Sequence, residues 1–161
     1  METRPLIVER LSDRFDLIID QRIADWVAQR IPDFGCGADF GPCVALGIGM
    51  GGELVAGCIY NSFQPAYKSI ELSMAATTPA WAKRVTIAAL LGYPFDQLQV
   101  NRVTTYTRKS NERALRLNAG LGFVREGIVR QGYGDEDAVI MGLLRSDAEK
   151  WLRGEKSTKS A

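Results

Sequence analysis

The segment at residues 110–127, SNERALRLNAGLGFVREG, limits the possible fold more than any other stretch of the chain. Polar, turn-prone residues open it, apolar residues at helical spacing follow, and a glycine-rich end passes into an apolar run. It therefore predicts a helix with a strand on either side. We expect Ser110 to cap the helix and Gly120 or Gly122 to end it in the left-handed conformation. An ordinary amphipathic surface helix would carry the same signals.

The N-terminal part of the chain predicts one strand and one long helix. Residues 6–8 form a short apolar run that suits a strand, and residues 11–13 suit a turn and a helix cap. Apolar residues then recur at every fourth position, which predicts an amphipathic helix that Pro32 ends. These positions are Phe15, Ile19, Ile23, Val27 and Ile31. The glycine-rich residues 33–42 are expected to form a loop, either a plain connector or a substrate contact.

The remaining segments predict mostly strands. The apolar runs at 44–50 and 54–63 are separated by Gly51 and Gly52, which predicts a hairpin with positive φ in its turn. Residues 68–76 alternate as a strand, with Glu71 on the face opposite to Leu72. A helix is expected over residues 81–97 and a strand over residues 102–107. Residues 124–130 and 138–144 predict a closing hairpin.

This order of elements predicts an α/β (α+β) fold with one mixed sheet and helices on both faces. At 161 residues, with 46% hydrophobic and 24% charged residues, the chain suits a single domain at residues 1–154 with a frayed polar tail at residues 155–161. The formal net charge of +1 offers no general attraction for nucleic acid or anionic lipid. With no apolar run long enough to span a membrane and no signal-peptide pattern, we expect a cytoplasmic protein.

Histidine is absent, and this restricts the available chemistry. Cys36, Cys43 and Cys58 have no histidine to complete a zinc site, so free thiols are favoured over a metal site or a disulfide. Any acid–base step falls to carboxylates, tyrosines or water.

The second half of the chain resembles the GNAT superfamily of N-acetyltransferases. The resemblance rests on the pattern N-x-x-A followed by L-G-F-x-x-E-G-x-x-R, which starts at Asn111 and ends at Arg130. In this form it looks most like the branch that acetylates ribosomal-protein N-termini. Residues 93–98 and 101–103 resemble the helix end and next strand of that branch. Asp137 and residues 143–145 resemble its final strand, while the first half matches only by element order.

The resemblance implies the acyl-CoA N-acyltransferase fold, in which a mostly antiparallel sheet splays between its fourth and fifth strands. Acetyl-CoA would bind in that cleft, pass its acetyl group directly to an amine, and require no metal. Glu71 would accept the amine proton, usually through water, although an exposed glutamate in a cross-strand ion pair fits the same pattern. Met74, Ala75 and Ala76 would offer backbone groups to the pantetheine arm. A homodimer is a further expectation from the resemblance.

The expected pyrophosphate cradle departs from the family pattern. Where relatives have small residues and glycines at a helix N-terminus, this chain has Lys83, Arg84, Val85 and Thr86 in a glycine-free loop. The two cations could still bind phosphate, or they could be solvated surface charges.

Three further contacts to the coenzyme follow from the resemblance. Ser110 and Asn111 would contact it, with helix capping as the competing role. Asn118 stands where many relatives place a tyrosine that protonates the leaving thiolate, and an asparagine side chain cannot give up a proton at useful pH. Tyr106 and Tyr133 are the tyrosines that could reach the site instead.

Two hypotheses therefore follow. The first is an N-acetyltransferase that acts on a primary amine of a protein N-terminus or a small molecule. The second is a non-catalytic GNAT-like module, similar to degenerate members carried by phages, that binds CoA or another protein. A nucleic-acid binder that uses Arg108, Lys109, Arg113 and Arg116 is disfavoured by the balanced charge.

Overall fold

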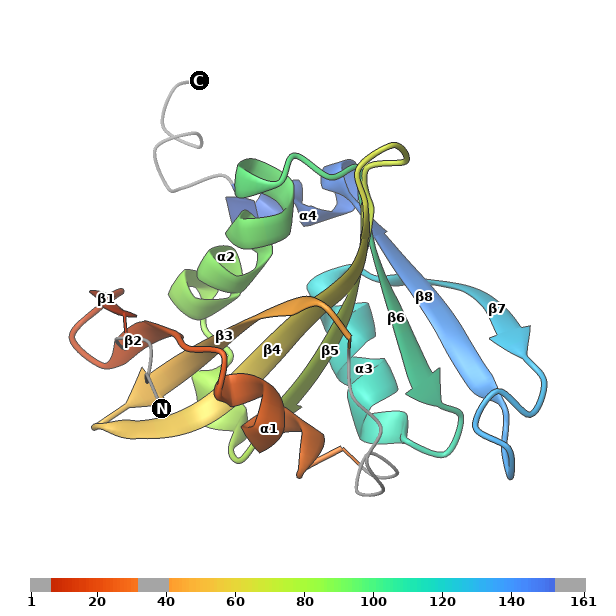
Figure 1. The fold of residues 1–161 in the computed structure, drawn as a ribbon, viewed down its shortest axis with the longest axis horizontal. Coiled ribbons are helices and arrows are strands. Elements are labelled where there is room, and N and C mark those ends of the chain that lie inside the picture. The colour runs from red at the N-terminus through yellow and green to blue at the C-terminus, as the bar shows by residue number, and fades with distance from the viewer. Residues whose placement is uncertain (1–6, 32–40, 153–161) are drawn as a thin grey trace.

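A computed structural model describes residues 7–31 and 41–152 as one mixed sheet with helices on both faces (Figure 1). The strands are β1 (Ile7–Arg10), β2 (Phe15–Ile19), β3 (Cys43–Met50), β4 (Glu53–Gln64), β5 (Ser69–Ala76), β6 (Arg102–Arg108), β7 (Val124–Val129) and β8 (Ala138–Leu144). The sheet order is β1-β2-β3-β4-β5-β6-β8-β7, and β5–β6 is its one parallel pair among the described strands. The predicted mixed sheet is confirmed.

Four α-helices cover this sheet. They are α1 (Ile23–Ala28), α2 (Arg84–Gly92), α3 (Glu112–Leu121) and α4 (Arg145–Leu152), with a short 3₁₀ turn, η2 (Pro79–Trp81), before α2 and a π-helical turn, η3 (Tyr93–Gln97), after it. Helix α1 packs on β3 and β4 from one face, where Val27 is fully buried. The other helices contribute to the main core on the opposite face.

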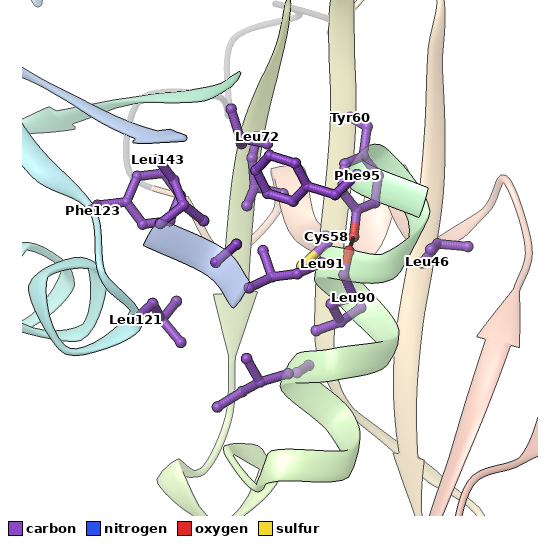
Figure 2. Close-up of a cluster of buried hydrophobic side chains, with 14 of the residues drawn as sticks. Leu46, Cys58, Tyr60, Leu72, Leu90, Leu91, Phe95, Leu121, Phe123 and Leu143 are labelled. Carbon is purple, nitrogen blue, oxygen red and sulfur yellow. Dashed lines mark hydrogen bonds between the residues drawn. The ribbon is translucent and has the colours of Figure 1, made fainter. Parts of the chain in front are cut away.

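The main core explains why the central strands alternate. Cys58 and Tyr60 of β4 and Leu72 of β5 point toward Leu90, Leu91 and Phe95 from α2 and η3, as Figure 2 shows. The Tyr60 hydroxyl donates a hydrogen bond to the Leu90 carbonyl at 2.5 Å, which satisfies the buried phenol. Burial also raises the pKa of the Cys58 thiol to about 12, so Cys58 is an unreactive free thiol. Cys43 is a free, half-buried thiol, and Cys36 lies outside the described residues.

The predicted N-terminal helix over residues 15–31 is wrong in its first half. Phe15–Ile19 is strand β2, and the helix begins only at Ile23. Phe15 and Leu17 are buried in the main core, whereas Ile18 packs with α1 on the other face. A spacing of four residues is an even number, so it fits the two-residue period of a strand as well as a helical turn. Pairing with β1 and β3 decided between them.

The hairpin prediction is confirmed. Met50 pairs with Glu53, and Gly51 and Gly52 have φ values of 61° and 84°. Farther along the hairpin, Gly47 pairs with Gly57 beneath α1. The absence of side chains at this pair lets α1 approach the sheet closely.

Two helix predictions need correction. The helix expected from residue 81 begins at Arg84, because η2 and an extended Lys83 precede it. Arg145 was placed with the final strand but begins α4, which the sequence pattern did not predict. Helix α4 leans on α2, and its Trp151 indole donates to the Leu121 carbonyl at 2.7 Å. Tertiary packing therefore stabilises a helix that has only a weak apolar stripe of its own.

Helix α3 forms as predicted but has a different cap. Asn111, not Ser110, is the capping residue, and its side-chain oxygen accepts a hydrogen bond from the Ala114 amide at 3.2 Å. The helix ends at Gly122, whose φ of 112° confirms one of the two predicted glycine stops. Phe123 then enters the main core.

No helix in the described parts of the chain is long and apolar enough to cross a membrane. The same residues contain no cluster of three potential metal ligands.

Candidate active site

A cleft of about 900 Å³ opens where β5 and β6 separate. The two strands pair only from Ser69 opposite Arg102 to Glu71 opposite Thr104, and beyond that point their edges diverge. The expected splay is therefore confirmed between the same two segments, which are the fifth and sixth strands of the structure because the unpredicted strand β2 precedes them. A volume of this size lies near the upper end of the range of about 300–1,000 Å³ found for ligand pockets.

The cleft walls come from several elements. Strands β5 and β6 supply residues 72–76 and 105–108, and α3 with its preceding turn supplies Ser110, Asn111, Arg113, Ala114, Leu117, Asn118 and Leu121. The remaining wall residues are Arg30, Ile31, Pro79, Trp81, Ala82, Tyr133 and Glu136.

The β5 edge of the cleft presents backbone hydrogen-bonding groups. The Thr77 amide donates to the Val55 carbonyl of the β4 side at 2.9 Å. In an antiparallel ladder, successive residues turn their N–H and C=O groups alternately toward and away from the partner strand. Ala75 therefore bonds toward β4, while Met74 and Ala76 direct their amides and carbonyls into the cleft. An extended ligand lying along β5 can pair with these groups as an added strand would.

The α3 wall contributes the polar side chains. Asn111, Arg113 and Asn118 all line the cleft, and the Asn118 amide lies 3.5 Å from the Thr105 hydroxyl. Within the described residues, the Arg113 guanidinium makes no ion pair or hydrogen bond, so it presents an uncompensated positive charge. This charge suits an anionic part of a ligand.

The predicted phosphate-binding residues at the start of α2 lie apart from the cleft-lining set. The Arg84 guanidinium donates to the Lys150 carbonyl and lies 5.8 Å from the Trp151 ring. Thr86 is fully buried, and its hydroxyl accepts from the Lys83 amide at 3.0 Å. Val85 packs against the main core, and the Lys83 side chain is exposed. The structure thus brings six of the predicted coenzyme contacts together around the cleft, namely Met74, Ala75, Ala76, Ser110, Asn111 and Asn118. The other four, Lys83, Arg84, Val85 and Thr86, are not among the residues that line it.

Glu71 lies at the branch point of the sheet. It pairs with Asn61 on β4 and Thr104 on β6, and it is half-buried just before the strand segment that lines the cleft. Its side chain lies on the same face as Ser73, a cleft residue. Both cross-strand neighbours are neutral, and in the described structure no ion pair or hydrogen bond engages the carboxylate. The alternative of a cross-strand ion pair therefore has no counterpart among these residues.

A polar cluster closes one rim of the cleft. We call it the rim cluster, and it consists of Arg108, Ser110, Tyr133, Asp135 and Glu136. The Arg108 guanidinium contacts Asp135 at 2.9 Å and Glu136 at 3.3 Å, and it lies 4.9 Å from the centre of the Tyr133 ring. Both the amide and the hydroxyl of Ser110 donate to Glu136, at 3.0 and 2.9 Å.

The rim cluster stabilises both of its carboxylates in the charged form. The hydrogen bond from the Ser110 amide is the main reason that the pKa of Glu136 is lowered, with Arg108 adding to it. The pKa of Asp135 is lowered chiefly by its hydrogen bond with Arg108. The sequence suggests Arg108 only as part of a disfavoured nucleic-acid site and does not single out Glu136. Their long separation in sequence left no local signal.

Solved structures of acetyltransferases share this architecture. One described as a "Probable acetyltransferase" has a TM-score of 0.68 and 16% identity, over 88% of this chain and 98% of that chain. A single-site mutant of the SpeG spermidine N-acetyltransferase from Vibrio cholerae has a TM-score of 0.68 and 14% identity, over 88% and 98%. Mutant forms of the spermidine/spermine N-acetyltransferase SpeG from the same organism have a TM-score of 0.60 and 18% identity, over 70% of each chain.

No protein-family model and no curated protein matches the sequence. The solved structures, together with the splay between β5 and β6 and the helices on both faces, identify the fold: this chain has the GNAT acetyltransferase fold.

Proposed function

We propose that this protein is an N-acetyltransferase that moves the acetyl group of acetyl-CoA to a primary amine. The observation that carries the proposal is the separation of β5 and β6 after Glu71 and Thr104, which opens a ligand-sized cleft with unpaired backbone groups along one edge. A thioester needs this kind of polar but enclosed surface, because its carbonyl oxygen gains negative charge as the amine attacks.

The coenzyme would bind along β5. The backbone groups of Met74 and Ala76 would form hydrogen bonds with the pantetheine arm, which would pass alongside Ala75. One of the two amides would donate to the thioester oxygen. Ser110, Asn111 and Asn118 would line the opposite side. Two features support this arrangement: the backbone N–H and C=O groups of β5 point into the cleft, and α3 forms the wall opposite to them.

The phosphates would lie near the N-terminus of α2. The first amides of a helix have no partner within the helix, so Arg84, Val85 and Thr86 would offer N–H groups and a positive dipole end. Lys83 would add a side-chain cation. Arg113, on the α3 wall, supplies a further cation that faces the cleft directly.

Glu71 would accept the proton that the amine loses, through a bound water. Its place at the branch point supports this role, as does the lack of a charged partner among the described residues. A carboxylate held by a strong ion pair would be a weaker base, because the partner stabilises its charged form.

The charges around the cleft favour a particular acceptor. The charged residues that line the described cleft are Arg30, Arg108, Arg113 and Glu136. Because Arg108 is paired with Glu136 and Asp135, the positive charge of the cleft comes from Arg30 and Arg113. Such a surface disfavours a polycationic acceptor like spermidine. The resemblance of the C-terminal motif to the ribosomal-protein branch supports the α-amino group of a protein N-terminus instead, and it also supports a homodimer.

A second candidate function is a CoA-binding or protein-interaction module without catalysis. Two observations favour it, namely the engagement of Arg84 with α4 and the presence of Asn118 where a proton donor would be useful. The two candidates differ in turnover, since both allow the coenzyme to bind.

The test is a titration with acetyl-CoA by calorimetry and thermal unfolding, followed by detection of free CoA thiol in the presence of amine acceptors. A ligand at one hundred times its Kd stabilises the folded state by about 2.7 kcal/mol, so a rise in Tm is expected. N-terminal peptides should then release thiol. Binding without thiol release from any amine would favour the CoA-binding module. No binding at millimolar acetyl-CoA would refute the enzyme and leave the protein-interaction module.

A further inference from the structure

Tyr133 lines the cleft, and its hydroxyl is held against strand β6. It donates a hydrogen bond to the Tyr106 carbonyl at 3.0 Å, and both residues line the cleft. The Lys109 amide donates to the Asp137 carbonyl at the start of β8, so by alternation the backbone groups of Tyr106 turn away from β8 and toward the gap with β5. The phenol is therefore held on the edge of β6 that faces Met74 and Ala76.

The rim cluster fixes this position. Tyr133 belongs to the loop between β7 and β8, which is far in sequence from β6 and α3. Arg108 ties this loop down through Asp135 and Glu136, and Ser110 holds Glu136 from the start of α3. The side chains of Arg108 and Glu136 are only 16% and 25% exposed, so this pair is less screened than an ordinary surface pair, whereas Asp135 is 75% exposed. The loop is thus anchored at two residues, Asp135 and Glu136, that closely follow Tyr133.

The proposed reaction needs a proton donor in the cleft. When the C–S bond breaks, the thiolate of CoA leaves with the electron pair, and a proton donor near the sulfur lowers the barrier. Asn118, on the α3 wall, cannot supply it. Tyr106 and Tyr133 are the phenols among the cleft-lining residues, and Tyr106 is 46% exposed on the face of β6 opposite to buried Thr105 and Thr107.

We propose that Tyr133 is the proton donor to the leaving thiolate, a role that rests on the proposed acetyltransferase function. The amine nitrogen attacks the thioester carbon and forms the C–N bond. The C–S bond then breaks, its electron pair goes to sulfur, and sulfur takes the phenolic proton of Tyr133. The amine proton leaves through water to Glu71, and the phenolate regains a proton from water.

Arg108 acts as a positioning residue in this scheme. Its guanidinium lies 4.9 Å from the ring of Tyr133, where a positive charge favours the transient phenolate. In the resting protein the Tyr106 carbonyl accepts a hydrogen bond from the Tyr133 hydroxyl, and rotation about the C–O bond can redirect this O–H group toward a ligand.

The test is Tyr133→Phe, which keeps the ring and removes the proton. In single-turnover experiments with acetyl-CoA, the rate of acetyl transfer should fall by about 10²-fold, within the usual range for a lost general acid, while the Kd for acetyl-CoA stays unchanged. The alkaline fall of the wild-type rate should also disappear, because a general acid works only when protonated. Tyr67→Phe, at a 79% exposed tyrosine, is the matched control and should behave like wild type.

Two more variants sharpen the result. Tyr106→Phe should keep the alkaline fall, and Asn118→Tyr added to Tyr133→Phe should restore part of the lost rate by offering a phenol from α3. A wild-type rate in Tyr133→Phe, or a loss explained entirely by weaker acetyl-CoA binding, would overturn the proposal while leaving the acetyltransferase function intact. If the folded wild-type protein transfers no acetyl group, the proposed function fails and this role with it.

Discussion

Glu71 of β5 lies opposite Thr104 of β6 in the last pair of the parallel ladder, at the point where the two strands separate. One residue therefore marks both the end of the continuous sheet and the start of the cleft. Residues before it, such as Ile70, are held in the core, whereas Met74 and Ala76 after it keep backbone groups available to a ligand. The proposed base thus lies on a rigid part of the fold, which is where a proton acceptor can be held in a constant geometry.

Replacing Glu71 with Gln should slow chemistry without weakening coenzyme binding. The amide keeps the shape of the side chain but cannot accept a proton, so we expect kcat to fall by about 10²-fold with the Kd for acetyl-CoA little changed. Steady-state kinetics and calorimetry measure the two effects separately. Glu53→Gln, at an exposed residue of the hairpin, is the control, and an unchanged kcat in Glu71→Gln would exclude Glu71 from the mechanism.

Removing the charge of Arg113 should weaken acetyl-CoA binding. A charge-assisted hydrogen bond to phosphate contributes about 1.5–3 kcal/mol when shielded and less when exposed, so Arg113→Ala should raise the Kd roughly 3- to 10-fold. The effect should vanish for acetyl-pantetheine, which lacks the charged nucleotide part. Arg116→Ala changes the same charge on the same helix but outside the cleft, and an equal effect there would show only a general charge contribution.

A methyl group at Gly57 should separate α1 from the sheet. An added Cβ would lie 2.6 Å from Val27 Cγ2 and 2.9 Å from Ile23 Cγ2, and these β-branched side chains cannot rotate away freely. Gly57→Ala should therefore lower the free energy of unfolding by about 1–3 kcal/mol. In contrast, Gly120→Ala meets no atom within 4 Å in α3 and should raise it by about 0.5–1 kcal/mol. Urea denaturation compares the two, and equal stabilities would contradict the packing argument.

The rim cluster should weaken in acid. The folded protein lowers the pKa of Glu136 below its ordinary value of 4.5, so the stabilising interactions are complete above that pH and are lost as the pH falls through the lowered pKa. The amide of Ser110 donates to this carboxylate and reports the change directly. Its NMR chemical shift should titrate with a midpoint below 4.5, and Glu136→Gln should abolish that titration. A midpoint above this value would mean that the pairs do not form.

Much of the C-terminal motif from Leu121 to Glu126 has a structural role. Leu121 and Phe123 are buried, Gly122 carries the left-handed turn, and Glu126 forms an ion pair of 2.6 Å with Arg102 across the sheet. These four residues stabilise the junction of α3 with the closing hairpin. The motif could therefore predict the fold from sequence while saying little about proton transfer.

By itself, the sequence determined the elements whose causes are local. The paired glycines at 51 and 52 permit the positive φ values of a hairpin turn. The polar residues before Glu112 and the glycine at 122 bound α3, although Asn111 and not the expected Ser110 is the cap.

Only the tertiary structure decided the features that depend on distant partners. Strand β2 exists because β1 and β3 pair with it, although its apolar spacing also suits a helix. The exit of β5 from its ladder, and the placement of the Tyr133 phenol beside Tyr106, depend on contacts across many residues of sequence. Such contacts form only once the whole sheet has assembled. Local propensity does not determine where two neighbouring strands separate, or which loop packs against the strand edge that this separation exposes.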